Sequence, residues 1–137
     1  MHNITSPDNS DPSIERQIQA KGLTGPRITP EDIKGIIVSE HYFTAAEAIR
    51  IPSAENPFGE APEATKLLTF CVLVLRNGFT VTVESACASP ENFDAQIGKR
   101  IARGNAEQKI WPLMGYALKD RLWRDSDDAA QYYRAVQ

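Results

Sequence analysis

The sequence predicts an α+β fold in which an N-terminal helix, an antiparallel β-hairpin sheet and a long kinked C-terminal helical segment follow one another. The hairpin is indicated by Asn77-Gly78, which lies between two runs of β-branched and apolar residues. The C-terminal helices are indicated by Ser89-Pro90, a typical helix start, and by apolar residues that recur at spacings of three or four after it. A chain of 137 residues, 42% of them hydrophobic, suits one small domain.

The composition divides the chain into a domain with two extensions. Residues 1–27 are rich in Ser, Pro, Asp, Asn and Gly, so we expect a flexible tail there, in which residues 13–21 could form a short helix. A single α+β domain is expected over residues 28–124, with a Pro-rich surface loop at 50–65. Residues 125–137 form a C-terminal extension, where an acidic start indicates a short helix.

The first helix of the domain is predicted from its start signal. Thr29 is followed by Pro30 and two acids, which is the order of an N-cap, a first-turn proline and charges that stabilise the helix dipole. Apolar residues at helical spacing come next, and they predict a helix that continues to about Tyr42 and Phe43.

The hairpin is predicted to join strands 66–75 and 79–88 through a two-residue type I′ turn. This turn places Val74 opposite Val81 and Cys71 opposite Glu84. One face of the hairpin is therefore the predicted core face, and its residues are Leu68, Phe70, Val72, Val74, Phe79, Val81 and Val83.

The opposite face of the first strand is also apolar, which indicates that something covers it. It carries Leu67, Cys71, Leu73 and Leu75 beside Thr69. A hairpin with two or three helices covers only one side well, so we predict a homodimer or a higher homo-oligomer.

The helical segment after the hairpin is predicted in two parts. The first runs over residues 90–110 and the second, contiguous or bent, over 111–123, because Pro112 removes a backbone donor and clashes with the preceding turn.

Composition excludes several classes of function. A net charge of −3 argues against binding to long nucleic acid, and no apolar run is long enough for a membrane span or a signal peptide. We therefore expect a soluble, cytoplasmic protein. The chain has only two histidines and two cysteines, and their spacing is not that of a metal site. They are His2, His41, Cys71 and Cys87, and neither a metal nor a cofactor is expected. No catalytic residue is predicted, because Ser85 and Cys87 have no activating base nearby in sequence.

Several segments resemble a known family. They are 28–43, the hairpin stretch Asn-Gly-Phe-Thr-Val-Thr at 77–82, Glu-Ser-Ala-Cys-Ala-Ser-Pro-Glu-Asn-Phe-Asp at 84–94, Ile97-Gly98-Lys99, and Lys-Ile-Trp-Pro-Leu-Met-Gly-Tyr at 109–116. Over about residues 28 to 122 the chain resembles the small phage and prophage family named after gene products of the N-four and Sf-six phages. That family is similar to phage anti-defence proteins that counter the Thoeris system. The resemblance implies a sponge, which binds a cyclic ADP-ribose-type signal, or in some cases cyclic oligonucleotides, without cleaving it.

A sponge needs cations for phosphates and aromatic faces for bases, and the helical segment contains both. The candidate ligand-binding residues are Asn92, Phe93, Lys99, Arg100, Arg103, Lys109, Trp111, Tyr116 and Arg121. Lys99, Arg100 and Arg103 are spaced to cluster on one side of a helix, although a solvated basic face would look the same. Phe93 could belong to the core, and Trp111 and Tyr116 could line a pocket or seal the core near the kink.

Two functions follow from this sequence. The first is a phage-encoded anti-defence protein in the infected cell that sequesters a cyclic nucleotide immune signal and is not an enzyme. The alternative is a phage accessory protein that binds a host protein and has no small ligand.

Overall fold

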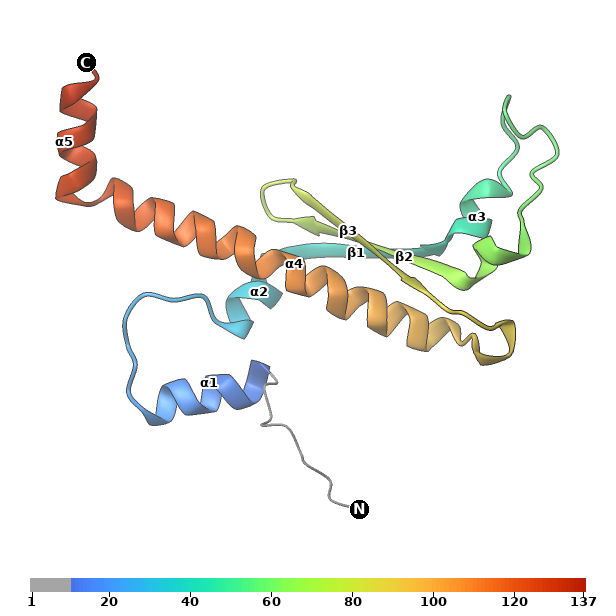
Figure 1. Ribbon diagram of the computed structural model, residues 1–137, viewed down its shortest axis with the longest axis horizontal. Coiled ribbons are helices and arrows are strands. Elements are labelled where there is room, and N and C mark those ends of the chain that lie inside the picture. Colours follow the sequence, from blue (N-terminus) through green and yellow to red (C-terminus); the bar gives the residue numbers. More distant parts are fainter. Residues whose placement is uncertain (1–10) are drawn as a thin grey trace. The chain divides into compact units, whose positions relative to one another are not determined.

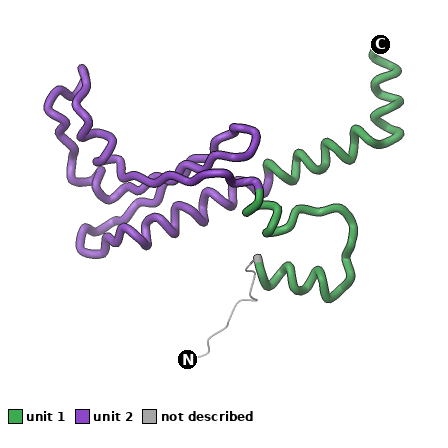
Figure 2. The backbone as a smooth tube through the Cα atoms, turned by 180° about the vertical axis from the view of Figure 1, so that it is seen from behind, with its two compact units in different colours: residues 1–35, 113–137 green, residues 36–112 purple. Residues whose placement is uncertain are grey.

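The computed structural model describes residues 11–137, which fall into two compact units, Ile36–Pro112 and residues 11–35 with 113–137 (Figures 1 and 2). The boundary between the two units falls between Pro112 and Leu113. The flexible tail predicted for residues 1–27 lies partly outside the described residues.

A three-stranded antiparallel sheet forms the centre of the larger unit. Its strands are β1 (Ile37–Thr44), β2 (Leu68–Leu75) and β3 (Thr80–Ala86), in the order β1-β2-β3. The prediction of a helix up to Tyr42 and Phe43 was wrong, because α2 covers only Pro30–Ile36 and the chain then becomes β1. The residues of β1 include β-branched and aromatic types that suit a strand, and pairing with β2 overrides the helical spacing that precedes them.

The turn between β2 and β3 differs from the predicted two-residue turn. Leu75 pairs with Phe79 through a 2.8 Å hydrogen bond between Leu75 N and Phe79 O, which leaves three residues in the loop. Only Gly78 has a positive φ there, at 86°, whereas a type I′ turn needs two such residues. Asn77 instead uses its side chain to accept a hydrogen bond of 3.0 Å from Phe79 N.

This longer loop shifts the register by one residue, so the predicted core face of β2 was also wrong. Cys71 lies opposite Val83, and Leu73 lies opposite Val81. A shift of one residue exchanges the two faces of a strand. The buried residues are consequently Thr69, Cys71, Leu73, Leu75, Val81 and Val83. Cys71 and Cys87 are free thiols.

The buried face of the sheet is covered by the first part of α4 (Ala95–Arg124) (Figure 1). Ala102, Ala106 and Ile110 are fully buried and follow one another at intervals of four residues. One turn earlier, Gly98 lies so close to the sheet that a Cβ atom there would be 2.9 Å from Thr69 Oγ1. Small side chains therefore let the helix approach the sheet closely.

The opposite face of the sheet remains open within this unit. Phe43 and Phe70 stack there with ring centroids 5.4 Å apart. We call this surface the open face; its residues are Phe43, Leu68, Phe70, Val72 and Val74, all half-buried. The register shift exchanged the two faces, but both faces of β2 are apolar, so the sheet still presents an uncovered apolar surface.

The start of α4 lies later than predicted. Ser89 and Pro90 open a short 3₁₀ turn, η2 (Pro90–Asn92), and the side chain of Ser89 makes no capping hydrogen bond. Asp94 caps α4 instead, since its Oδ1 accepts a 3.0 Å hydrogen bond from Ile97 N. The helix then continues through Pro112 to Arg124 as one element, so the two parts predicted from the sequence are contiguous.

The Pro-rich segment between β1 and β2 has a defined structure. It contains α3 (Ala45–Ile49) and η1 (Glu63–Leu67), and Asn56 organises the loop between them. The Asn56 amide donates to Ile49 O and Glu60 O, at 3.1 and 3.0 Å, and its oxygen accepts from Glu60 N at 3.2 Å.

The smaller unit contains α1 (Asp11–Ala20), most of α2, the end of α4, and α5 (Asp127–Ala135). Arg27 forms a 2.6 Å ion pair with Glu15 of α1. Ser126 caps α5, so the acidic extension does form the short helix that the sequence indicated. None of the helices in residues 11–137 has the length and apolar character needed to cross a membrane.

Candidate functional site

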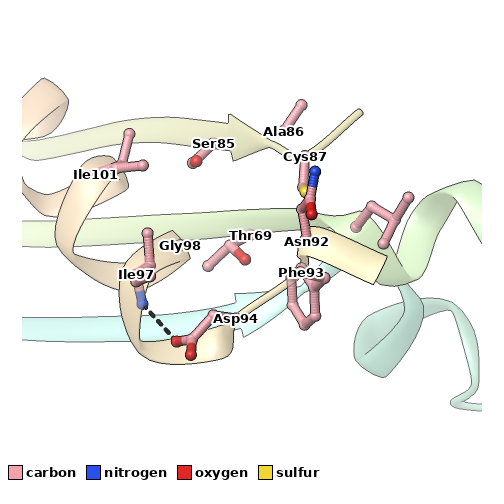
Figure 3. A pocket seen from close by; sticks show the side chains of 11 residues that line it. Thr69, Ser85, Ala86, Cys87, Asn92, Phe93, Asp94, Ile97, Gly98 and Ile101 are labelled. Atoms are coloured by element: carbon pink, nitrogen blue, oxygen red, sulfur yellow. Dashed lines mark hydrogen bonds between the residues drawn. The ribbon is translucent and has the colours of Figure 1, made fainter. Parts of the chain in front are cut away.

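A small pocket lies where the end of β3, η2 and the first turns of α4 meet (Figure 3). Its volume is about 130 Å³. We call it the Phe93 pocket, and it is lined by Leu67, Thr69, Ser85, Ala86, Cys87, Asn92, Phe93, Asp94, Ile97, Gly98 and Ile101. Most of these residues belong to the segment 84–94 and to the first turns of α4, so local sequence builds most of the pocket.

Thr69 contributes a buried hydroxyl group without a partner. The residue is only 2% exposed, and its Oγ1 has no hydrogen-bond partner among residues 11–137. A buried hydroxyl group without a hydrogen bond costs about 1–3 kcal/mol. Because Thr69 lines the pocket, a bound molecule with a polar group could remove this cost.

The other polar groups of the pocket differ in how they are engaged. Cys87 Sγ donates to Ser89 O at 3.2 Å, and Asp94 is occupied as the cap of α4. The Ser85 hydroxyl and the Asn92 amide also line the pocket, and neither side chain makes a hydrogen bond within the described part of the chain. The pocket thus presents hydroxyl and amide groups beside the ring of Phe93, and no histidine lines it.

A second, larger hollow adjoins the pocket and shares Leu67 and Phe93 with it. We call it the Arg50 groove. Its volume is about 380 Å³, and it is lined by Thr44, Ala46, Glu47, Arg50, Glu63, Lys66, Leu67, Pro90 and Phe93. The ring of Phe93 therefore contributes both to a pocket whose only charged lining residue is Asp94 and to a groove lined by two cations and two carboxylates.

Of the residues predicted from sequence, Asn92 and Phe93 lie together in the Phe93 pocket. Arg100 does not line the Phe93 pocket but a second hollow that shares Ile97 and Ile101 with it, while Lys99 lies near Tyr42 of β1. The three basic residues at 99, 100 and 103 are thus divided between two sides of α4.

Lys99 and Arg103 are engaged with residues of β1. Lys99 Nζ lies 6.0 Å from the ring centre of Tyr42. Arg103 bridges two carboxylates, Glu40 at 2.8 Å and Glu107 at 2.9 Å. Burial lowers the pKa of Arg103, but the hydrogen bond to Glu40 and the charges of Glu107 and Glu40 outweigh it, so the pKa is raised. These contacts tie α4 to β1 and partly neutralise the cations.

The remaining predicted residues lie further along α4. Lys109 Nζ donates to Thr82 O of β3 at 3.1 Å, and Trp111 is half-buried in the larger unit. Tyr116, which is 75% exposed, and Arg121 belong to the smaller unit. The larger unit therefore brings only Asn92 and Phe93 of the predicted set into one pocket.

Three residues of the site were missed from sequence. Thr69 was assigned to the outer face of the hairpin, so its burial in a pocket could not be expected. Arg50 and Lys66 are separated by the Pro-rich loop, which was read as a surface connection. The loop contains several residues that favour turns, among them Asn56 and Gly59. These residues were the one indication in the sequence that the loop folds back toward residue 50.

Residues 28–122 match the model of the phage protein (N4 Gp49/phage Sf6 gene 66) family. The chain belongs to this family. The match includes the whole sheet, the Phe93 pocket and the Arg50 groove, but not α1 or α5. Neither the curated proteins nor the solved structures contain a match to the chain.

Within this phage family member, the stretch that first indicated the resemblance also builds the candidate site. The segment from Glu84 to Asp94 supplies six of the residues that line the pocket: Ser85, Ala86, Cys87, Asn92, Phe93 and Asp94. The family resemblance and the pocket geometry therefore point to the same part of the larger unit.

Proposed function

We propose that this phage protein binds and sequesters a cyclic nucleotide immune signal of the cyclic ADP-ribose type, or a cyclic oligonucleotide, without cleaving it. The observation that carries the proposal is the Phe93 pocket, where an aromatic ring, an amide and an unpartnered buried hydroxyl group lie together. Aromatic rings stack on nucleobases, and amides and hydroxyl groups hydrogen-bond to base edges or sugars.

Binding without turnover is supported by the chemistry of the lining. Hydrolysis or group transfer needs an activated nucleophile or a positioned acid and base. The Cys87 thiol donates a hydrogen bond to a backbone carbonyl, and Asp94 is used as a helix cap. The pocket lining lacks the histidine or lysine that would activate Cys87 or Ser85. We therefore assign the protein no catalytic residue.

The size of the site favours a second copy of the chain. Sites for small molecules usually have volumes of about 300–1,000 Å³ and surround most of the ligand. At about 130 Å³ the Phe93 pocket is smaller than this range, and the adjoining groove is open to solvent. Another subunit would enclose the ligand. The open face, on the side of the sheet opposite α4, separately provides an apolar surface for a homodimer or a higher oligomer.

The open face also supports the alternative function. A half-buried apolar sheet surface is typical of protein contacts in general. An accessory protein that uses it to bind a host protein would need no small ligand.

Calorimetric titration of the purified full chain with cyclic ADP-ribose isomers and cyclic di- and trinucleotides tests the proposal. The recovered ligand should be unchanged. We expect Phe93→Ala to weaken binding about 5- to 150-fold, since stacking contributes about 1–3 kcal/mol per base. Asn92→Ala should also weaken binding, because it removes a hydrogen-bonding amide from the pocket. Lys119→Glu, in the smaller unit, should change it little. Turnover would indicate an enzyme, and no binding across the panel would favour the host-protein alternative.

A further inference from the structure

A nucleotide site needs positive charge for the phosphates, and the basic residues predicted on α4 do not line the Phe93 pocket. The Arg50 groove contains two cations beside that pocket. Arg50 and Lys66 both line the groove, next to the ring of Phe93. Arg50 follows α3 directly, and Lys66 lies in η1, so the two cations come from opposite ends of the Pro-rich loop.

The loop fixes the backbone of Arg50. Its N–H donates to Ala46 O at 2.9 Å, and Gly59 lies against its carbonyl group, where a Cβ atom would be 2.3 Å from the oxygen. Gly59 has a φ of +61°, which glycine adopts without strain. The side chain of Arg50 forms no ion pair or hydrogen bond within residues 11–137 and is exposed. A fixed backbone with an unpaired guanidinium group is well prepared to bind an anion.

Two carboxylates also line the groove, and they are held differently. Glu47 completes the cap of α3, since its side chain accepts a hydrogen bond of 3.2 Å from Thr44 N. Glu63 forms a 2.6 Å ion pair with Lys66, and its side chain is 85% exposed. The pKa of Glu63 is lowered, first by the hydrogen bond from Lys66 and also by the charge of Arg50. The Glu63 carboxylate is thus the anion that the two cations stabilise in this structure.

From this arrangement we infer that the Arg50 groove binds a phosphate or pyrophosphate group, held by Arg50 and Lys66 in place of the Glu63 carboxylate. Exposed ion pairs stabilise a protein by only about 0–1 kcal/mol, so a doubly charged anion can displace Glu63. The inference rests on the proposed function in that it orients the nucleotide, with its base in the Phe93 pocket and its phosphates in the groove. It adds Arg50 and Lys66 to the ligand-binding residues.

Pyrophosphate is the direct probe, because it tests the groove without a base. Two-dimensional NMR of the full chain should show pyrophosphate shifting the signals of Arg50 and Lys66. Arg50→Gln and Lys66→Gln should each weaken pyrophosphate binding about tenfold, whereas Glu63→Gln should strengthen it severalfold. Lys119→Gln removes the same charge from the smaller unit and should have no effect.

ADP-ribose then distinguishes a nucleotide site from a site for free phosphate. It should bind more tightly than pyrophosphate, and Phe93→Ala should abolish that difference while the affinity for pyrophosphate is retained. Absence of pyrophosphate binding, or an unchanged affinity in both glutamine variants, would overturn the inference. If cyclic nucleotides bind the natural chain and the Arg50→Gln and Lys66→Gln variants equally, the orientation is wrong but the proposed function stands. If the chain binds pyrophosphate but none of the cyclic nucleotides, the anion site stands and the proposed function is wrong.

Discussion

At the scale of single residues, Thr69 shows how stability and ligand binding can oppose each other. Its hydroxyl group is buried under Gly98 without a hydrogen bond, although valine would fill nearly the same volume. Natural proteins accept such costs mainly at functional sites, where a bound molecule supplies the missing partner. This makes Thr69 the residue at which the proposed site can be tested through stability as well as affinity.

We predict that Thr69→Val raises the free energy of unfolding by about 1 kcal/mol, because it removes an unpaired buried hydroxyl group. The same variant should weaken binding of the cyclic nucleotide. Urea denaturation and calorimetry measure the two effects. Thr82→Val, on the exposed side of β3, controls for the preference of strands for valine. A loss of stability in Thr69→Val would show that the hydroxyl group has a partner in the folded protein.

Tyr42 leads to a prediction about pH. Burial first, and then the neighbouring Cys71 and Glu40, raise the pKa of Tyr42 to about 12 from an ordinary value of 10.0. The folded state therefore holds this proton more tightly than the unfolded state. The stability that this proton contributes is fully present below pH 10 and should be lost as the pH rises toward 12. Urea midpoints measured across this range should fall more steeply in the natural chain than in Tyr42→Phe.

At the scale of elements, the existence of the hairpin was predictable and its register was not. Asn-Gly favours more than one tight turn, and Asn77 adopts the three-residue form because its side chain bonds to Phe79 N. One additional loop residue then exchanged the faces of β2. The start of β1 was likewise not predictable. The isoleucines before it have helical spacing, and only the pairing with β2 shows where the strand begins.

The candidate site was predictable only where one short segment builds it. Asn92 and Phe93 lie next to each other after a strand and before a helix, so their role as lining residues could be anticipated. Thr69 depends on the register, and Arg50 and Lys66 depend on how a long loop folds. Tertiary contacts decide both of these, and no local pattern carries that information.

The close contact between α4 and the sheet is tested by a pair of glycines in the same helix. At Gly98 an added Cβ atom would lie 2.9 Å from Thr69 Oγ1, whereas at Gly104 it would meet nothing within 4 Å. Gly104→Ala should stabilise the protein by about 0.5–1 kcal/mol through helix propensity. Gly98→Ala gains the same propensity but should destabilise it by about 1–3 kcal/mol, because Thr69 is buried and cannot move away. Equal effects in thermal denaturation would mean that the helix is not so close.

At the scale of the whole molecule, the main question is what covers the open face. Both faces of β2 are apolar, so one helix layer leaves Leu68, Phe70, Val72 and Val74 half-buried whichever register the hairpin adopts. The prediction of an oligomer therefore did not depend on the turn. The prediction depends instead on the three-stranded sheet being covered by α4 on only one of its two faces.

We predict that the protein is a dimer or a higher oligomer in solution, and that Val72→Glu converts it into monomers. Val72 lies on the central strand of the open face, opposite His41 and Thr82, so a carboxylate there would have to be desolvated in any contact across the sheet. Size-exclusion chromatography with light scattering measures the mass, and Gln108→Glu on the exposed side of α4 is the control for added charge. Circular dichroism checks that Val72→Glu remains folded.

The same variant connects assembly to binding. If a second copy completes the site around Phe93, a folded Val72→Glu monomer should lose most of its affinity for the cyclic nucleotide, although residue 72 does not line the pocket. Full affinity in the monomer would show that the Phe93 pocket and the Arg50 groove suffice within one chain. A natural chain that is itself monomeric would remove the second copy from the mechanism and leave the open face to a partner of another kind.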